Sequence, residues 1–295
     1  MPDAMDRGDV PALPATIELS ARSIAADPAA LTLIPAATRV YLVDAGDDPA
    51  VRWAEACLRL VRAGLEPVPH IACRRLRSSE EIDERLGAMA GAAGIRDVLV
   101  VGGDIGRPLG PFASSLDLLE SGLLERHGIR RIGIAGHPEG SPDVPPAAIV
   151  DALHRKIEFG ARTGLDVRLV TQFGFDPEAT IRWAERMAGE GIGLPIHAGV
   201  AGPTGMTRLL KYAALCGVRA SASFALKRGA ALTSLMGGYS PEPCARAIER
   251  SDRIKQLHVY AFGGLPAAAR WLVGRGSWRE RSEAVLALQS TRRMP

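Results

Sequence analysis

Short apolar runs rich in β-branched residues alternate with longer amphipathic stretches along most of the chain. Each run has the length and the continuous hydrophobicity of a parallel strand that is buried on both faces. The eight runs span residues 16–19, 39–43, 67–72, 97–101, 131–135, 167–172, 194–198 and 256–261. Eight strands that alternate with helices predict an α/β fold, a closed (β/α)8 TIM barrel, in preference to an open doubly wound sheet.

The stretches between the runs have the features of crossover helices. After the sixth run, Asp176 followed by Pro177 is typical of a helix N-terminus. Gly94 and Gly164 each stand shortly before a predicted strand, where a left-handed residue would end the preceding helix. The stretch between the seventh and eighth runs is the longest, and it is expected to hold an extra helix or a lid behind a glycine-rich start at 199–205.

The pattern predicts one folded domain. No interior linker divides the chain, so residues 15–295 are expected to form a single catalytic barrel. Residues 1–14 carry Asp3, Asp6, Asp9 and three prolines. They offer too little apolar surface to offset the entropy of ordering, and a disordered N-terminal arm is expected there.

Composition narrows the class of protein further. The chain has 36 basic and 33 acidic residues and a net charge of +3, which gives no reason to expect nucleic acid as a partner. No apolar run approaches the roughly 18 residues of a membrane span, and the N-terminus lacks an apolar signal core. The four cysteines form no CxxC pair. We therefore expect a soluble cytoplasmic protein with reduced thiols.

Polar side chains follow the predicted strands at the point where each strand ends. They are Glu18, Asp44, His70, Asp104, His137, Glu139, Gln172, His197 and Tyr260. In a parallel barrel these ends converge on one mouth, where barrel enzymes hold their active sites. For any single residue, the exit of the chain from the core explains the polarity equally well, but the whole set favours a site.

Glu18 is the most informative of these residues, because it lies within the apolar run Thr-Ile-Glu-Leu. A partly desolvated carboxyl group there would have a raised pKa and could serve as a general acid. A salt bridge from Glu18 to Arg22 is the structural alternative.

Two other kinds of site are open at this level. His70, His137 and His197 could ligate a catalytic zinc ion, which would indicate a metal-dependent hydrolase. The glycine-rich segments 102–104 and 199–205 could cradle a phosphate, although neither matches a dinucleotide fingerprint or a P-loop. A barrel that binds a ligand without catalysis is a third reading.

Several motifs resemble those of the methylenetetrahydrofolate reductases in order and spacing. They are Pro-His-Ile-Ala-Cys at 69–73, Gly-Gly-Asp at 102–104, His-Pro-Glu-Gly at 137–140, Leu-His-Arg-Lys at 153–156, Val-Thr-Gln-Phe-Gly-Phe-Asp at 170–176 and His-Val-Tyr at 258–260. The resemblance extends from about residue 16 to about residue 274, and it implies a single TIM barrel that contains no metal.

The resemblance implies reduction of 5,10-methylenetetrahydrofolate to 5-methyltetrahydrofolate with NAD(P)H, usually through FAD. Glu18 falls at the family's general acid, and Asp104 falls at a carboxylate that stabilises a cation near the pterin. Gln172 falls at a glutamine that hydrogen-bonds the pterin, and Phe175 and Tyr260 are expected to contact the folate. The implied context is one-carbon metabolism and methionine biosynthesis, and a folate-dependent methyl or methylene transferase is the alternative.

The resemblance also implies a cofactor-binding role for five residues, which are His70, Gly102, His137, Glu139 and Lys156. The family's Arg-Gly-Asp is Gly-Gly-Asp here, so an arginine that helps to hold the flavin is missing unless Arg107 or Arg155 replaces it. Two mechanisms follow: a flavin that carries the hydride between NAD(P)H and folate, or direct transfer from the nicotinamide, which the altered contacts favour slightly. The motifs are compatible with NADH or NADPH, with either direction and with a homo-oligomer.

Overall fold

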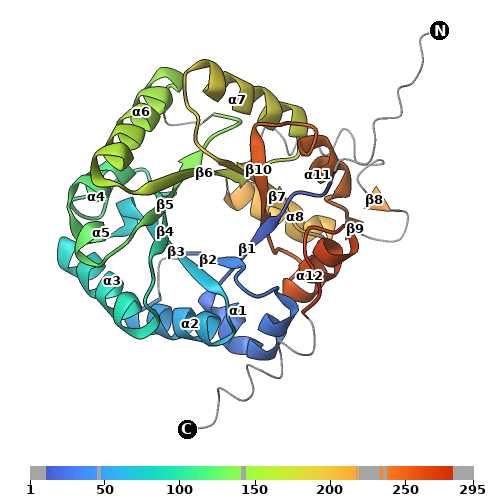
Figure 1. Ribbon diagram of the computed structural model, residues 1–295, viewed down its shortest axis with the longest axis horizontal. Coiled ribbons are helices and arrows are strands. Elements are labelled where there is room, and N and C mark those ends of the chain that lie inside the picture. Colours follow the sequence, from blue (N-terminus) through green and yellow to red (C-terminus); the bar gives the residue numbers. More distant parts are fainter. Residues whose placement is uncertain are drawn as a thin grey trace.

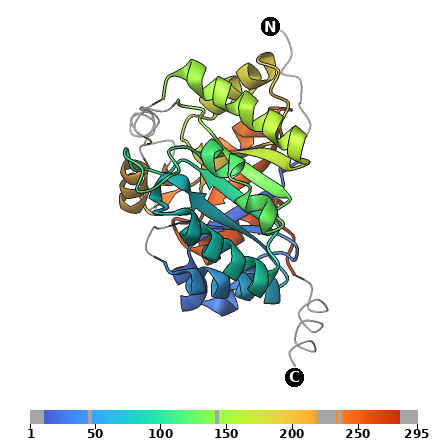
Figure 2. The same ribbon diagram turned by 90° about the vertical axis from the view of Figure 1, so that its left-hand side faces the viewer.

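Eight parallel strands close into a barrel surrounded by helices (Figure 1, and from the side in Figure 2). The computed structural model describes residues 11–44, 48–140, 144–216, 218, 233–234 and 238–281. The strands of the barrel are β1 (Ala15–Leu19), β2 (Arg39–Leu42), β3 (Glu66–Ala72), β4 (Asp97–Val101), β5 (Arg131–Gly136), β6 (Asp166–Phe173), β7 (Ile196–Ala201) and β10 (Ile254–Tyr260). β10 pairs with β1 and closes the ring. The predicted (β/α)8 barrel and its eight strands are confirmed.

The helices follow the strands as predicted. They are α1 (Ala21–Ala26), α2 (Ala50–Arg62), α3 (Ser79–Ala93), α4 (Ser115–Glu120), α5 (Leu123–Arg126), α6 (Pro146–Thr163), α7 (Pro177–Gly189), α8 (Met206–Leu215), α11 (Glu242–Ile248) and α12 (Leu265–Gly274). Asp176 caps α7 by accepting hydrogen bonds from the N–H groups of Glu178 and Ala179. Gly94 and Gly164 end α3 and α6 in left-handed conformations.

The long stretch between β7 and β10 holds the extra helical structure expected there. It contains α8, α11 and the short antiparallel pair β8 (Thr233–Ser234) and β9 (Gly238–Tyr239). Two 3-10 segments, η1 (Pro28–Leu33) and η2 (Cys73–Arg75), follow α1 and β3. Within the described ranges, no helix is both long and apolar enough to cross a membrane.

The main apolar core lies between the strands and the helices, and a smaller cluster fills part of the barrel interior. Tyr41 belongs to this inner cluster, and its hydroxyl accepts a hydrogen bond from Arg168 Nε at 2.8 Å. Arg168 Nη2 in turn donates to Asp97 Oδ1 at 2.8 Å. Because the charges of Arg168 and Asp97 are buried but paired, this network can hold Tyr41 in a fixed position inside the barrel.

The predicted N-terminal arm is only partly covered by the structure, because residues 1–10 lie outside the described ranges. Its last residues run beside the barrel, where the backbone N–H of Leu13 donates to Glu249 Oε1 at 2.9 Å.

Candidate active site

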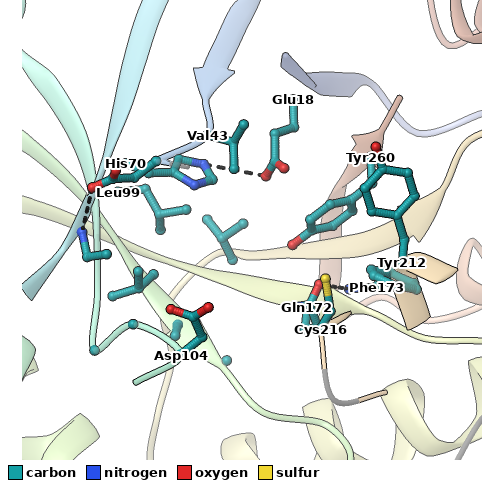
Figure 3. A pocket seen from close by; sticks show the side chains of 18 of the residues that line it. Glu18, Val43, His70, Leu99, Asp104, Gln172, Phe173, Tyr212, Cys216 and Tyr260 are labelled. Atoms are coloured by element: carbon teal, nitrogen blue, oxygen red, sulfur yellow. Dashed lines mark hydrogen bonds and ion pairs between the residues drawn. The ribbon is translucent and has the colours of Figure 1, made fainter. Parts of the chain in front are cut away.

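A large cavity of about 1240 Å³ lies at the carboxyl ends of the strands, and Figure 3 shows part of its lining. The expected site residues that line it are Glu18, His70, Gly102, Asp104, His137, Glu139, Lys156, Gln172 and Tyr260. The fold therefore gathers residues from strands β1, β3, β6 and β10, together with helix α6 and the loops after β4 and β5, around one space. This agrees with the position of active sites in parallel barrels.

Phe175 is the expected substrate-binding residue that the structure does not place on the cavity. Its side chain is buried beyond the end of β6, where its ring packs edge-on against Phe173 at 5.8 Å and against Tyr239 at 5.8 Å. Phe173 lines the cavity instead. Phe173 also contacts Tyr260 and Phe262, which line the cavity. Phe175 therefore supports these aromatic side chains from behind.

The three histidines considered as zinc ligands are not brought together. β7 begins at Ile196, two residues later than predicted, so His197 lies near the start of its strand and is buried below the mouth. His70 and His137 line the cavity, whereas His197 does not. Across the part of the chain that the structure describes, no group of three or more metal-binding side chains is assembled.

Glu18 points toward two histidines on other strands (Figure 3 shows His70). Its Oε2 atom lies 3.5 Å from Nε2 of His70 and 3.5 Å from Nε2 of His258. The other ring nitrogen of His258, Nδ1, lies 3.1 Å from the hydroxyl oxygen of Thr16. The ring of Tyr41 packs edge-on against both imidazoles. The carboxyl group of Glu18 is thus mostly enclosed by these side chains, yet it still lines the cavity.

Burial sets the protonation state of this cluster. It raises the pKa of Glu18, although the nearby His70 acts in the opposite direction. Burial also lowers the pKa of His70 to about 4 and that of His258 to about 3. Both imidazoles are therefore neutral near pH 7 and supply no full charge to hold Glu18 ionised. Arg22, the alternative partner, lies 3.9 Å from Asp48 instead.

Asp104 has the opposite environment. Its side chain is 64% exposed and forms two hydrogen bonds of 2.8 Å with the guanidinium of Arg75. These bonds lower the pKa of Asp104, so the group is an ionised carboxylate. Figure 3 places Asp104 and Glu18 on different sides of the cavity. A ligand between them would face an acid on one side and an anion on the other.

Gln172 reaches the cavity through a bulge at the end of β6. The pairing of β6 with β7 shifts register between Val170 and Phe173, and the side-chain oxygen of Gln172 accepts a hydrogen bond from the N–H of Phe173 at 3.0 Å. Gly199 on β7 makes the bulge feasible, because a Cβ there would lie 2.5 Å from the carbonyl oxygen of Thr171. With its oxygen engaged, the exposed Gln172 amide can offer N–H groups to a ligand.

An aromatic wall completes one side of the cavity. Tyr212 from α8 stacks on Phe262 with ring centroids 4.3 Å apart, and Phe262 contacts Phe173 and Tyr260. The hydroxyl of Tyr260 donates to the carbonyl of Thr171 at 3.1 Å. Sequence patterns gave no reason to expect Tyr212 or Phe262 here, because both lie outside the strands and approach the site only through the fold.

The lining of the cavity also includes cationic side chains. Lys156 on α6 lines the cavity, and burial lowers its pKa as well as that of His137. Arg74, which the sequence motifs did not single out, also lines the cavity and lies over Gly102. Neither arginine expected as a replacement is part of the lining: Arg107 is exposed, and Arg155 lies 3.7 Å from Glu120.

A closed (β/α)8 barrel with a buried carboxyl group of raised pKa, an ionised carboxylate and an amide around one cavity defines a barrel enzyme of the acid–base type. The family model described as methylenetetrahydrofolate reductase matches residues 39–263, and the chain belongs to that family. The predicted resemblance is confirmed.

Curated relatives agree with this assignment. The 5,10-methylenetetrahydrofolate reductase of Pectobacterium carotovorum subsp. carotovorum is 32% identical over 160 residues, which cover 54% of this chain and 51% of that protein. The protein of the same name from Escherichia coli (strain K12) is 28% identical over 208 residues, 68% of this chain and 67% of that protein. The match thus spans about half the length of the first relative and two thirds of the second.

Among solved structures, dihydropteroate synthase from Thermus thermophilus aligns over 90% of this chain and 94% of its own, with a TM-score of 0.46 and 14% identity. A likeness this distant says nothing about function.

Proposed function

We propose that this protein interconverts 5,10-methylenetetrahydrofolate and 5-methyltetrahydrofolate with NAD(P)H as the redox partner. Membership of the family and the names of the relatives support the reaction. The single structural observation that carries the proposal is Glu18, a carboxyl group on the wall of the cavity that lies between two imidazoles and whose pKa burial raises. An acid of this kind is what opening of the imidazolidine ring requires.

The site residues divide the work of the reaction. Glu18 donates its proton to a ring nitrogen of the bound folate, which lets the ring open to an iminium cation. Asp104, ionised in its pair with Arg75, stabilises the positive charge that develops. Gln172 orients the pterin through its free amide N–H groups. In the reverse direction, Glu18 takes the proton back.

The size of the cavity supports the proposal that a dinucleotide binds beside the folate. Its volume of about 1240 Å³ exceeds the roughly 300–1,000 Å³ of ordinary ligand pockets, and Lys156 offers a cation for a pyrophosphate. When bound, the nicotinamide supplies the hydride. Gly102 and His137 depart from the family's flavin contacts, and room for two substrates at once supports direct transfer by proximity, without FAD.

The visible spectrum of the purified protein, followed by methylenetetrahydrofolate-dependent oxidation of NADH and NADPH, tests this proposal. We expect a colourless protein whose activity is unchanged by added FAD. Flavin bands, or a requirement for FAD, would replace direct transfer with the flavin route. Absence of folate-dependent oxidation under every condition would overturn the reductase itself and favour the transferase alternative.

Two broader features belong to the same proposal. We take residues 15–295 as one catalytic barrel domain behind an arm of residues 1–14. The cysteines Cys57, Cys73, Cys216 and Cys244 are all free, which supports a reducing, cytoplasmic setting in one-carbon metabolism and methionine biosynthesis.

A further inference from the structure

Arg74 lies beside Gly102, the residue at which this chain departs from the arginine that its resemblance to the family implies. It belongs to η2, directly after β3, and its guanidinium lies against Gly102 at the end of β4. A Cβ on Gly102 would lie 3.5 Å from Nη2 and 3.8 Å from Cζ of Arg74. An arginine at position 102 would therefore begin in contact with a cation that is already present. Glycine at position 102 therefore avoids placing a second cation against the guanidinium of Arg74.

The guanidinium of Arg74 is fixed in place. Its Nε donates to the carbonyl of Gly102 at 3.2 Å, and its Nη2 donates to the carbonyl of Gly103. The backbone N–H of Arg74 also donates to Gly102 at 3.0 Å, and its carbonyl accepts from Leu109 at 2.8 Å. A guanidinium held in this way loses little freedom when it binds a ligand, and its Nη1 donors are not used by these contacts.

The charge of Arg74 is only partly offset by the protein, since the nearby Asp104 carboxylate acts on it electrostatically but forms its ion pair with Arg75. Its partners are carbonyl groups, whereas the neighbouring Arg75 has a carboxylate partner in Asp104. Within the described ranges, no carboxylate lies at ion-pair distance from Arg74 or from Lys156. Both cations line the same cavity, and both act electrostatically on Cys73. Two cations that line one cavity near Cys73 and have no ion-pair partner in the described residues predict an anionic ligand that contacts both.

We infer that Arg74 and Lys156 together bind the pyrophosphate of the dinucleotide, with Arg74 replacing the arginine that the family has at position 102. The inference rests on the proposed function for the identity of the dinucleotide, and the shared chemistry is the pyrophosphate of NAD(P)H or of FAD. Arg74 supplies a planar fork of N–H donors, and Lys156 supplies a compact second charge.

Direct binding tests the inference without turnover. Dissociation constants for NADH and for FAD are measured by calorimetry on the wild type, on Arg74→Ala and on Arg107→Ala. Arg107→Ala removes the same charge from an exposed position that does not line the cavity. We expect Arg74→Ala to weaken binding of the dinucleotide by at least about tenfold, and Arg107→Ala to change it by less than about twofold.

The melting temperature of each variant shows whether it is folded. A folded Arg74→Ala protein with wild-type affinity would overturn the inference, as would a larger loss in Arg107→Ala. The double variant Arg74→Ala, Gly102→Arg provides a second test, since it moves the guanidinium back to the family's position. We expect it to regain at least about threefold of the lost affinity; no recovery would overturn the claim that the two positions replace each other.

The binding measurements with NADH and FAD also separate this inference from the proposed reaction. Tight binding of NADH but not FAD would identify NADH as the dinucleotide whose pyrophosphate binds here. The reverse result would identify FAD. If Arg74→Ala weakens binding but no folate-dependent oxidation is found, the reductase proposal fails and the pyrophosphate site stands. A wild-type protein that binds neither dinucleotide overturns both.

Discussion

The pKa values of two carboxyl groups at the same cavity are shifted in opposite directions by their surroundings. Glu18 sits between neutral imidazoles and an aromatic ring, where burial raises its pKa. Asp104 is exposed and paired with Arg75, which lowers its pKa. The difference assigns the roles: a proton donor on one side and an electrostatic stabiliser on the other.

Replacing Glu18 tests the first role. We expect Glu18→Gln to lower reductase turnover by at least about a hundredfold, because glutamine keeps the shape of the side chain but has no acidic proton. In the wild type, turnover should fall as the pH rises through the raised pKa of Glu18, since only the protonated form donates. Profiles of kcat against pH for both proteins measure this. Turnover near the wild-type value in Glu18→Gln would remove the residue from the mechanism.

Individual site residues were predictable where they interrupt a pattern. Glu18 is a charged residue in an apolar run, and Asp104 and Gln172 end buried strands. Arg74 could not be found in this way, because its importance comes from its contact with Gly102, 28 residues later. The burial of Phe175 behind the cavity lining could not be predicted for a related reason: a motif specifies neighbours along the chain but not which side of a turn faces the cavity.

At the scale of elements, the junction between β6 and β7 determines where Gln172 lies. The two strands change register at the bulge, and the N–H of Gly199 donates to the hydroxyl of Thr171 at 2.8 Å. A side chain on Gly199 would collide with backbone atoms of β6, which cannot move aside as the end of a flexible side chain can.

Gly199→Ala should therefore disturb the site as well as the fold. We expect a loss of about 1–3 kcal/mol in the free energy of unfolding, typical of overpacking, together with a raised KM for folate because Gln172 shifts. Urea denaturation and steady-state kinetics measure the two effects. Gly193→Ala is the matched control, since its added Cβ meets nothing within 4 Å. Equal stability and equal KM in both variants would contradict this account of the bulge.

The strands were predictable because buried parallel strands appear in the sequence as continuous apolar runs. The seventh was placed two residues too early at its start and three too early at its end. Leu194 and Pro195 extend the apolar run in front of the strand, and Gly199 resembles a loop residue even though it lies inside the strand. A glycine required by close approach of two backbones cannot be distinguished from a loop glycine by composition alone.

At the scale of the whole molecule, the barrel interior holds three buried histidines. Burial lowers the pKa of His70 to about 4 and the pKa values of His197 and His258 to about 3. These groups are neutral in the folded state but take up protons near pH 6.5 once unfolded. Their contribution to stability is therefore present above pH 6.5 and is lost as the pH falls toward 4 and 3.

The protein should consequently unfold in mild acid. Each of the three histidines can contribute up to about 1.4 kcal/mol for each pH unit below 6.5, and Glu18, with its raised pKa, acts in the opposite direction, so we expect a net fall in stability of at least about 1 kcal/mol between pH 6 and pH 5. Urea denaturation at pH 7, 6 and 5 measures the slope, and His197→Gln should make it shallower, because one of the three histidines no longer titrates. The same free energy of unfolding at pH 7 and pH 5 would show that the histidines are protonated inside the barrel.

The pairing of the first strand with the last has a consequence for synthesis on the ribosome. Glu18 is translated early, but His258, which faces it, lies on the strand that closes the barrel, and Glu18 pairs in register with Tyr260. A nascent chain carries the acid for most of its synthesis in contact with water, where it is an ordinary ionised glutamate. The Glu18 carboxyl group acquires its raised pKa only when the last strand has closed the barrel. A truncated chain would therefore contain Glu18 but would lack the buried acid.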